Sequence, residues 1–240
     1  MNNPCRGFST LLRAALGAQW AHLHPDIRAR FTLAPGATRQ RFTGSMREID
    51  RSFIGGLIAR AIAFMRVLPP DRARDVSFEF NLSLAPMSAS NSAAGWIKER
   101  LYHFDDGDFE FRSIMSITRN GDLIEQFAYG LGMKIKLGAE GNNGDQLTFR
   151  DDGYFLRIGS LRLSIPRWLA VGHFTLTHQN IDRNHFTVDI RIAHPLFGRL
   201  FYQVGSFKQA PLASSAPSAA ATDVSARDKA YSVVRDTTCW

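Results

Sequence analysis

Alternating apolar and polar side chains dominate the chain from residue 75 onwards. In the stretch DVSFEFNLSLAP, which begins at Asp75, every second residue from Val76 to Leu84 is apolar, and the residues between them are mostly polar. A period of two is typical of a β-strand with one buried face. Similar runs predict further strands at about 96–104, 109–119, 122–129, 132–140, 145–151, 154–164, 172–180, 184–193 and 197–206.

Short turn signals separate most of these predicted strands. Asn120-Gly121 and Asp152-Gly153 favour tight hairpins, because Asn, Asp and Gly tolerate the positive φ angles that such turns need. Strands joined in this way pair antiparallel, and a meander of about ten strands must curl, split or close, since exposed edges promote aggregation. We therefore expect a mainly β (α+β) fold, a strongly curved antiparallel sheet or barrel of about ten strands.

The first 70 residues carry a helical period instead. It predicts helices over residues 8–33 and 51–67, with a strand at about 41–49 between them. Asp50 is placed to act as the N-cap of the second helix. Its apolar stripe, which we expect to pack against the sheet, consists of Phe53, Ile54, Leu57, Ile58, Ala61, Phe64 and Met65. The two N-terminal helices should cover the sheet or plug a barrel.

The composition indicates one folded domain followed by a tail. With 45% hydrophobic and 21% charged residues, the chain can bury a sizeable core. Residues 1–208 are predicted to form a single α+β domain. Residues 209–240 are rich in Ala, Ser and Pro without apolar periodicity, which predicts disorder.

The formal charge of +7 is concentrated near the N-terminus. Residues 1–74 contain twelve arginines and four acidic residues, whereas the rest of the chain is nearly neutral. Such a region could serve nucleic acid, anionic lipid or an acidic partner. No finger, RNP-like or basic-heptad pattern accompanies it, so nucleic acid is the weakest of these interpretations.

Signals for export, metals and common catalytic sites are missing from the sequence. The two cysteines, Cys5 and Cys239, offer neither a disulfide framework nor a CxxC site, which favours a cytoplasmic protein without a metal. No apolar run is long enough to cross a bilayer. There is no GxSxG, HExxH or Walker A pattern, so no cofactor is predicted and the balance is against an enzyme.

Glu125 is the first candidate for chemistry, because it stands between apolar residues in the run LIEQF. It shares a strand face with Leu123 and Phe127, whereas Ile124 argues that the other face is the inner one. If Glu125 faces inward, burial would raise its pKa unless an arginine such as Arg100 or Arg112 pairs with it. A purely structural ion pair is the ordinary interpretation.

The strand WIKERLYHF is the second candidate. Its residues Trp96, Arg100, Tyr102 and Phe104 share one face with Lys98, which combines aromatic walls with basic donors. Inside a barrel such a face would suit an anionic amphiphile or a planar ligand. An outer face with snorkelling basic side chains is the slightly stronger interpretation, because both faces carry apolar residues.

A series of short motifs follows a fixed order along the chain. In order, they are LGAQWAHLHPDIRARF, RFTGSMREID, GGLIARAIAFMRVLPP, DVSFEF, FRS, LIEQF, LSIPRWLA and FTVDIRIAHPLFGRLFYQVGSF. Together these motifs resemble one bacterial family, the uncharacterised domain of unknown function 4166. The likeness covers about residues 8–208, with EQFA at Glu125 where the family tends to have Glu-Arg-Phe-Gly. Members also occur fused to saccharopine-dehydrogenase-like domains, which implies a dehydrogenase-like protein partner. The family has no established activity, so no catalytic residue is transferred.

Three functions remain open at this point. The first is a non-catalytic binding domain for a small amphiphilic or lipid-like ligand, with Glu125, Arg100, Trp96, Tyr102 and Phe104 around the pocket. The second is an enzyme or accessory domain that uses Glu125 with a nucleotide-binding dehydrogenase-like partner. The third is a peripheral module that binds anionic membranes or proteins through the basic N-terminal third and the helix at 51–67.

Overall fold

The structure is a computed structural model, which describes residues 8–34, 37–69, 72–85, 95–159 and 161–210. The two cysteines and the predicted tail beyond Ala210 lie outside these ranges. The helices are α1 (Phe8–Leu16), α2 (Pro25–Arg30) and α3 (Phe53–Ala61), and single 3-10 turns are η1 (Gly17–Ala21), η2 (Ala63–Met65), η3 (Ala128–Gly130) and η4 (Asn142–Gly144). The strands are β1 (Arg39–Arg51), β2 (Ala73–Leu84), β3 (Trp96–Phe104), β4 (Gly107–Ile117), β5 (Leu123–Gln126), β6 (Leu131–Glu140), β7 (Gln146–Ile158), β8 (Leu161–Ile165), β9 (His173–Asn180), β10 (His185–His194) and β11 (Gly198–Ala210).

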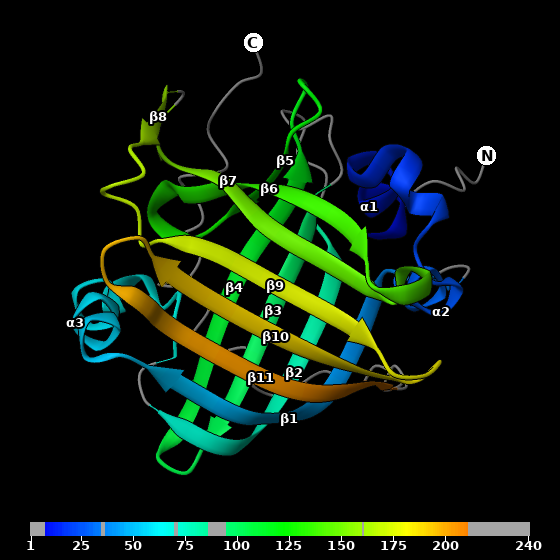
Figure 1. The fold of residues 1–240 in the computed structure, drawn as a ribbon, viewed down its shortest axis with the longest axis horizontal. Helices are drawn as coiled ribbons and strands as arrows, with labels where there is room; N and C mark the ends of the chain where they lie inside the picture. Colours follow the sequence, from blue (N-terminus) through cyan, green and yellow to red (C-terminus); the bar gives the residue numbers. More distant parts are fainter. Residues whose placement is uncertain (1–7, 35–36, 70–71, 86–94, 160, 211–240) are drawn as a thin grey trace.

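The strands form one antiparallel sheet that closes on itself (Figure 1). Their order is β6-β5-β4-β3-β2-β1-β11-β10-β9-β7-β8, and a further pairing of β6 with β7 joins the two sides. Ten strands therefore make a closed barrel, and β8 extends from it as the second strand of a hairpin with β7. The predicted mainly β fold of about ten antiparallel strands is confirmed. Closure gives each of the ten barrel strands a partner on both sides for at least part of its length, which reduces the exposed strand edge.

The predicted hairpin turn at Asp152-Gly153 is wrong, because β7 runs through these residues as one bent strand. Two residues of β7 bulge opposite Lys134, and Gly153 takes a φ of +111° there. The bulge bends the strand, so its first half closes the barrel against β9 and its second half pairs with β8. The turn signal thus marks a bulge within a strand.

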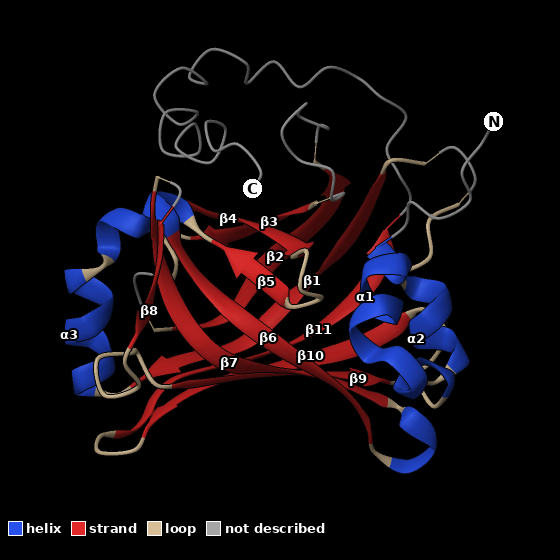
Figure 2. Ribbon diagram, turned by 90° about the horizontal axis from the view of Figure 1, so that it is seen from above, coloured by secondary structure: helices blue, strands red, loops and turns tan. Residues whose placement is uncertain are grey.

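Helices cover both open ends of the barrel (Figure 2). α1 and α2 lie at one end, where Phe8 packs edge-on against Trp96 with ring centroids 5.5 Å apart. α3 lies at the other end, and its Gly55 approaches the backbone of Leu200 at the start of β11. The predicted helical stretch 8–33 is thus two short α-helices joined by η1.

α3 differs from its prediction in its cap and in its buried face. Ser52, rather than Asp50, is the N-cap, and its hydroxyl oxygen accepts a hydrogen bond from the Gly55 N–H at 3.1 Å. Asp50 remains in β1, where its carboxylate pairs with arginines. The apolar stripe is also divided, since Ile54 and Ile58 pack against the core while several of its large side chains face outward. Packing of the whole stripe against the sheet is therefore wrong.

Candidate functional site

The barrel contains two apolar cavities that share part of their lining. The inner one, of about 80 Å³, reaches the α1 and α2 end at Phe8 and Phe31. The outer one, of about 110 Å³, reaches the α3 end at Val67 and Leu68. They share the lining residues Lys98, Arg100, Tyr102, Phe149, Leu176, Ile190 and Gln203. The polar residues of this shared lining are Lys98, Arg100, Tyr102 and Gln203. Together with Glu125 and Ser113, which are hydrogen-bonded to them, they form a layer between the two chambers that we call the waist.

The register of three consecutive strands brings the waist residues together. β4 pairs with β3 so that Ser113 lies opposite Lys98, and with β5 so that Met115 lies opposite Glu125. Ser113 and Met115 are two residues apart and share a face, so Lys98, Ser113 and Glu125 all point into the barrel. Two tight hairpins are enough to build this layer from residues 98–125.

Glu125 is the centre of the waist. Its Oε2 accepts a hydrogen bond from Lys98 Nζ at 2.9 Å, and its Oε1 accepts from Arg100 Nη2 at 3.0 Å and from Ser113 Oγ at 2.5 Å. Arg100 Nη1 also donates to Ser113 Oγ at 3.0 Å. Glu125 is almost completely buried, so these are charge-assisted bonds in a medium of low dielectric constant.

Two cations share this one carboxylate, and the pKa values reflect the imbalance. Burial lowers the pKa of Lys98 from 10.5 to about 8; the charge of Glu125 opposes this shift and that of Arg100 adds to it. Burial disfavours the charged form of Glu125 as well, but Lys98, Arg100 and the hydrogen bond from Ser113 outweigh it and lower the pKa from 4.5 to about 2. The carboxylate is fully satisfied, whereas one buried positive charge lacks a counterion within the waist.

A second set of polar groups at the waist consists of Tyr102 on β3 and Gln203 on β11. The Tyr102 hydroxyl donates a hydrogen bond to Gln203 Oε1 at 3.2 Å, and Gln203 Nε2 lies 3.0 Å from the sulfur of Met46. Burial raises the pKa of Tyr102, so its hydroxyl stays protonated. These neutral groups can donate and accept hydrogen bonds without adding charge.

Three of the five residues predicted to bind a ligand line the cavities, and two do not. Arg100, Tyr102 and Glu125 lie in the lining. Trp96 is buried against Phe8, and Phe104 stacks on Tyr102 with ring centroids 5.9 Å apart; neither lines a cavity. The slightly preferred outward orientation of this β3 face is wrong, because the face points into the barrel.

Lys98 lines both cavities as well. The alternation of β3 predicted that it shares a face with Arg100, although it was not among the five residues predicted to bind a ligand. Ser113 and Gln203 carry no local signal, because their roles depend on strand register. Of the two arginines considered for Glu125, Arg100 makes the ion pair, and Arg112 lies 3.8 Å from Glu99 instead.

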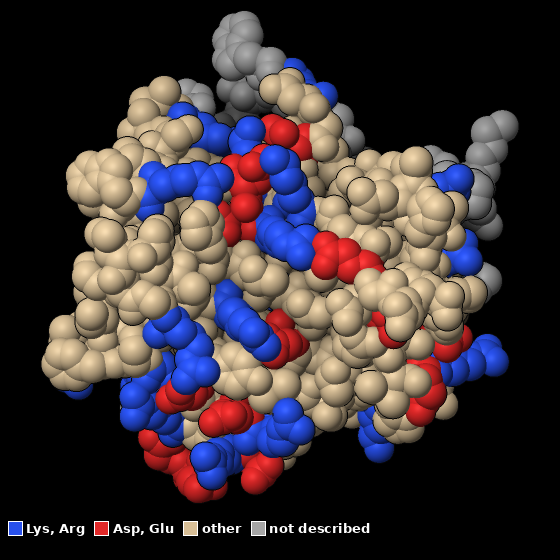
Figure 3. All heavy atoms as spheres, viewed as in Figure 1, with Lys and Arg blue, Asp and Glu red and all other residues tan. Residues whose placement is uncertain are grey.

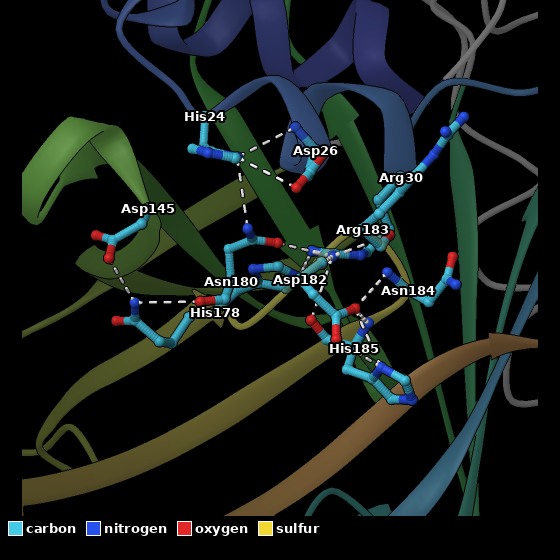
Figure 4. Close-up of polar contacts among 11 residues, drawn as sticks. His24, Asp26, Arg30, Asp145, His178, Asn180, Asp182, Arg183, Asn184 and His185 are labelled. Atoms are coloured by element: carbon cyan, nitrogen blue, oxygen red, sulfur yellow. Dashed lines mark hydrogen bonds and ion pairs between the residues drawn. The ribbon is translucent and has the colours of Figure 1, made fainter.

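A buried arginine fixes the helical cover at the α2 end (Figure 4). Arg30 Nη2 donates to Asn180 Oδ1 at 2.8 Å and to the Asp182 carbonyl oxygen at 2.7 Å, in the β9–β10 turn. Its guanidinium also lies 4.8 Å from the ring centroid of Phe186. Burial lowers the pKa of Arg30 to about 10, so the side chain is charged at neutral pH. The arginine ties α2 to this turn, next to Phe31 and Phe186 in the wall of the inner chamber.

His178 contacts both this arginine and the inner chamber. Its Nε2 lies 3.2 Å from Arg30 Nη1, and because arginine can only donate, Nε2 is the acceptor and Nδ1 carries the proton. Burial and the charge of Arg30 lower the pKa of His178 from 6.5 to about 3. The ring is therefore neutral at physiological pH.

The described part of the chain contains no group of three or more His, Cys, Asp or Glu side chains that could hold a metal ion. Within the same ranges, no helix is both long and apolar enough to cross a membrane.

The fold and the cavities together define a closed antiparallel β-barrel with an apolar interior and a buried ionic layer at its waist. The chain belongs to the family described as domain of unknown function (DUF4166), which matches residues 23–207. It is also similar to the uncharacterized protein YndH of Bacillus subtilis (strain 168), with 23% identity over 189 residues, which cover 78% of this chain and 91% of that protein. The dehydrogenase-like partner stays a prediction from the resemblance.

Proposed function

We propose that the barrel is a non-catalytic binding domain for a small amphiphilic molecule with an anionic headgroup. The observation that carries this proposal is the charge imbalance of the waist, where Lys98 and Arg100 share the single carboxylate of Glu125 inside an apolar cavity. The headgroup would lie at the waist, and the apolar part would lie in the outer chamber.

An anionic headgroup fits the waist for an electrostatic reason. A buried charge without a counterion is costly, and a ligand carboxylate or phosphate would neutralise it. The Tyr102 hydroxyl and the Gln203 amide are close enough to the same layer to orient its oxygen atoms. The apolar walls would contribute through burial of the tail, at about 0.8 kcal/mol for each methylene group.

The direct test is binding of a fluorescent fatty acid and of the corresponding fatty alcohol, measured by titration. The acid should bind at least about tenfold more tightly, since a hydrogen bond to a charged group contributes about 1.5–3 kcal/mol. Arg100→Met should reduce this preference, and Arg112→Met, on the adjacent strand and outside the cavities, should leave it unchanged. Equal affinity for acid and alcohol, or no binding of either, would contradict the proposal.

The affinity for the acid should also depend on pH. Lys98 has a pKa of about 8 without ligand, and an anion at the waist favours its protonated form. Affinity should therefore be constant between about pH 6 and 7, where the fatty acid is ionised, and fall as the pH rises through 8, while the affinity for the alcohol should change little. Lys98→Met should abolish the pH dependence.

The alternative use of Glu125 as a catalytic acid or base receives less support. An efficient general acid or base has a pKa near the working pH, and the pKa of Glu125 is lowered to about 2. Its two oxygen atoms already accept three hydrogen bonds from neighbouring side chains. Glu125 is better suited to hold the two cations in place.

A further inference from the structure

Four segments surround the barrel mouth beside α3, and we call them the mouth ring: residues 53–69, 128–130, 161–171 and 194–200. The start of α3 is held against this ring by a hydrogen bond from the Ser52 N–H to the Leu200 carbonyl oxygen at 3.1 Å. Segments that are distant in the sequence thus meet at one end of the molecule (Figure 2).

Contacts on the other side make the mouth ring continuous. Phe64 packs against Tyr129 with ring centroids 5.3 Å apart. Gly130 lies so close to β7 that a Cβ atom there would be 2.2 Å from the Arg157 carbonyl oxygen. β7 leads into β8, and the loop after β8 lines a small depression together with Pro195 of the β10–β11 turn.

Large apolar side chains on the mouth ring are exposed. α3 and η2 contribute Phe53 (79% exposed), Leu57 (54%) and Phe64 (64%), and the other segments contribute Trp168 (72%), Leu169 (60%), Leu196 (80%) and Phe197 (48%). Single exposed apolar residues are ordinary, but a group of aromatic and aliphatic residues at one end of a molecule marks an interaction surface.

The charges on the mouth ring have one sign. Its four segments contain five arginines and no acidic residue, namely Arg60, Arg66, Arg162, Arg167 and Arg199. Arg199 is paired with Asp50, whereas the other four take part in no ion pair with any described residue. On the face shown in Figure 3, the end of the molecule over α3 carries few charged side chains. The surface is therefore apolar with isolated positive charges.

The mouth ring also forms the entrance of the outer cavity. Ile62, Val67 and Leu68, which follow α3, line this cavity, and so does Val171 from the loop after β8. A molecule that passes between the outside and the waist by this route must cross the ring. An apolar surface at such an entrance is consistent with transfer to or from another apolar phase.

We propose that the mouth ring docks on the surface of an anionic lipid bilayer, with the barrel mouth facing the membrane. Its aromatic and aliphatic side chains would enter the interfacial region, and its arginines would contact lipid phosphates. This surface shares α3 and η2 with the membrane-binding hypothesis from the sequence. It leaves out the rest of the basic N-terminal third and adds β8, the loop after it and the β10–β11 turn. Docking goes beyond the proposed ligand binding and does not require it.

The test is flotation of the purified protein with vesicles of phosphatidylcholine alone or with 30% phosphatidylglycerol, a proportion of roughly the order needed for a substantial negative surface potential. We expect binding only to the anionic vesicles and weaker binding at high salt. Arg60→Gln and Arg167→Gln should each lower the partition coefficient about fivefold. Each basic residue near an anionic surface contributes about 1 kcal/mol of binding free energy, which corresponds to a factor of about five.

Matched controls lie in the β9–β10 turn, at the opposite end of the barrel. Leu196→Ser in the mouth ring should weaken vesicle binding, whereas its control Ile181→Ser in the β9–β10 turn should not. Both side chains are exposed. Arg183→Gln is the equivalent control for Arg167→Gln. Trp168 provides a direct signal, because its emission should shift to shorter wavelength on binding and the shift should be lost in Trp168→Phe.

Three results would overturn the proposal. They are absence of binding to anionic vesicles at low salt, equal binding to neutral vesicles, and equal loss in the mouth-ring and control variants. A dimer in solution that Leu196→Ser dissociates, with no vesicle binding, would assign the surface to a second copy of the chain instead. Fatty-acid binding by a protein that does not bind vesicles would leave the proposed function intact and reject only the docking.

Discussion

At the scale of single residues, the most consequential feature is a glutamate that stabilises two cations inside the barrel, the buried Lys98 and the partly buried Arg100. Lys98 and Arg100 are two residues apart on β3, so both must point into the barrel, and Glu125 reduces the cost of burying them. The ion pairs connect β3 to β5 through Ser113 of β4. They therefore fix the register of three strands as well as the charge of the interior.

Removal of the carboxylate should be strongly destabilising. Glu125→Gln leaves the buried Lys98 and the partly buried Arg100 without an anion, and we expect the free energy of unfolding to fall by about 3–5 kcal/mol. Adding Lys98→Met to Glu125→Gln leaves Arg100 as the one charge of the waist, so the net charge of +1 is the same as in the wild type. The double variant should therefore recover part of the lost free energy of unfolding. Urea unfolding of the two single variants and the double variant measures this coupling; strictly additive effects would mean that the two residues do not interact.

His178 should make stability depend on pH in the acid range. Its pKa is about 3 in the folded protein and 6.5 when unfolded, so the unfolded chain binds more protons between these values. Stability should therefore fall as the pH is lowered from 6.5 towards 3. His178→Gln keeps an acceptor for Arg30 and should flatten this part of the profile, measured by urea unfolding at several pH values. An unchanged slope would show that other groups cause the acid sensitivity, Glu125 below about pH 4.5 among them.

At the scale of secondary-structure elements, the attachment of α3 depends on one of two adjacent glycines. Gly55 faces β11, where a Cβ atom would lie 2.0 Å from the Leu200 carbonyl oxygen, whereas a Cβ on Gly56 would come no nearer than 3.8 Å to Arg51. The helix can approach the barrel this closely only because Gly55 has no side chain.

This difference predicts opposite effects for the same substitution. Gly55→Ala should displace α3 and lower the free energy of unfolding by about 1–3 kcal/mol, in the range of overpacked sites. Gly56→Ala should raise it by about 0.5–1 kcal/mol, because alanine favours the helix. Thermal unfolding of both variants and of the wild type measures this difference. A Gly55→Ala variant that is more stable than the wild type would contradict the close packing of Gly55 against Leu200.

The elements also show what the sequence could and could not predict. Period-two alternation located β3 at residues 96–104, because that strand has no bulge and is flanked by turn residues. The same rule wrongly predicted two strands in place of β7, separated at Gly153. A glycine with positive φ occurs in bulges as well as in hairpin turns, so the sequence does not distinguish them. It could not orient Glu125 either, because Ile124 on the opposite face is buried as well. The face of β3 that points inward depends on closure of the sheet, which the sequence of one strand does not contain.

At the scale of the whole molecule, closure divides the strands into two classes. The ten barrel strands pair on both sides for at least part of their length, whereas β8 pairs only with one half of β7 and its side chains are mostly exposed. A strand with one partner and little burial opens locally at low free energy.

Hydrogen exchange should therefore separate β8 from the barrel. Amides of β8 should exchange orders of magnitude faster than those of β9 and β10, which are hydrogen-bonded within the barrel wall. Exchange followed by mass spectrometry on peptides that cover residues 161–165 and 185–194 measures the difference. Equal protection of the two peptides would mean that β8 is covered by a further contact, such as a second molecule.

The pairing of β1 with β11 also affects how the chain is made. These partners are between 150 residues (Arg51 and Phe201) and 169 residues (Arg41 and Ala210) apart, so the last seam cannot form while residues 198–210 are still unsynthesised or inside the ribosome. Until then the nascent chain exposes two strand edges, the state most prone to aggregate, and long-range pairing of this kind is slow. Successful production of this protein thus depends on protecting an incomplete wall during translation, a task suited to chaperones that bind exposed β-strands.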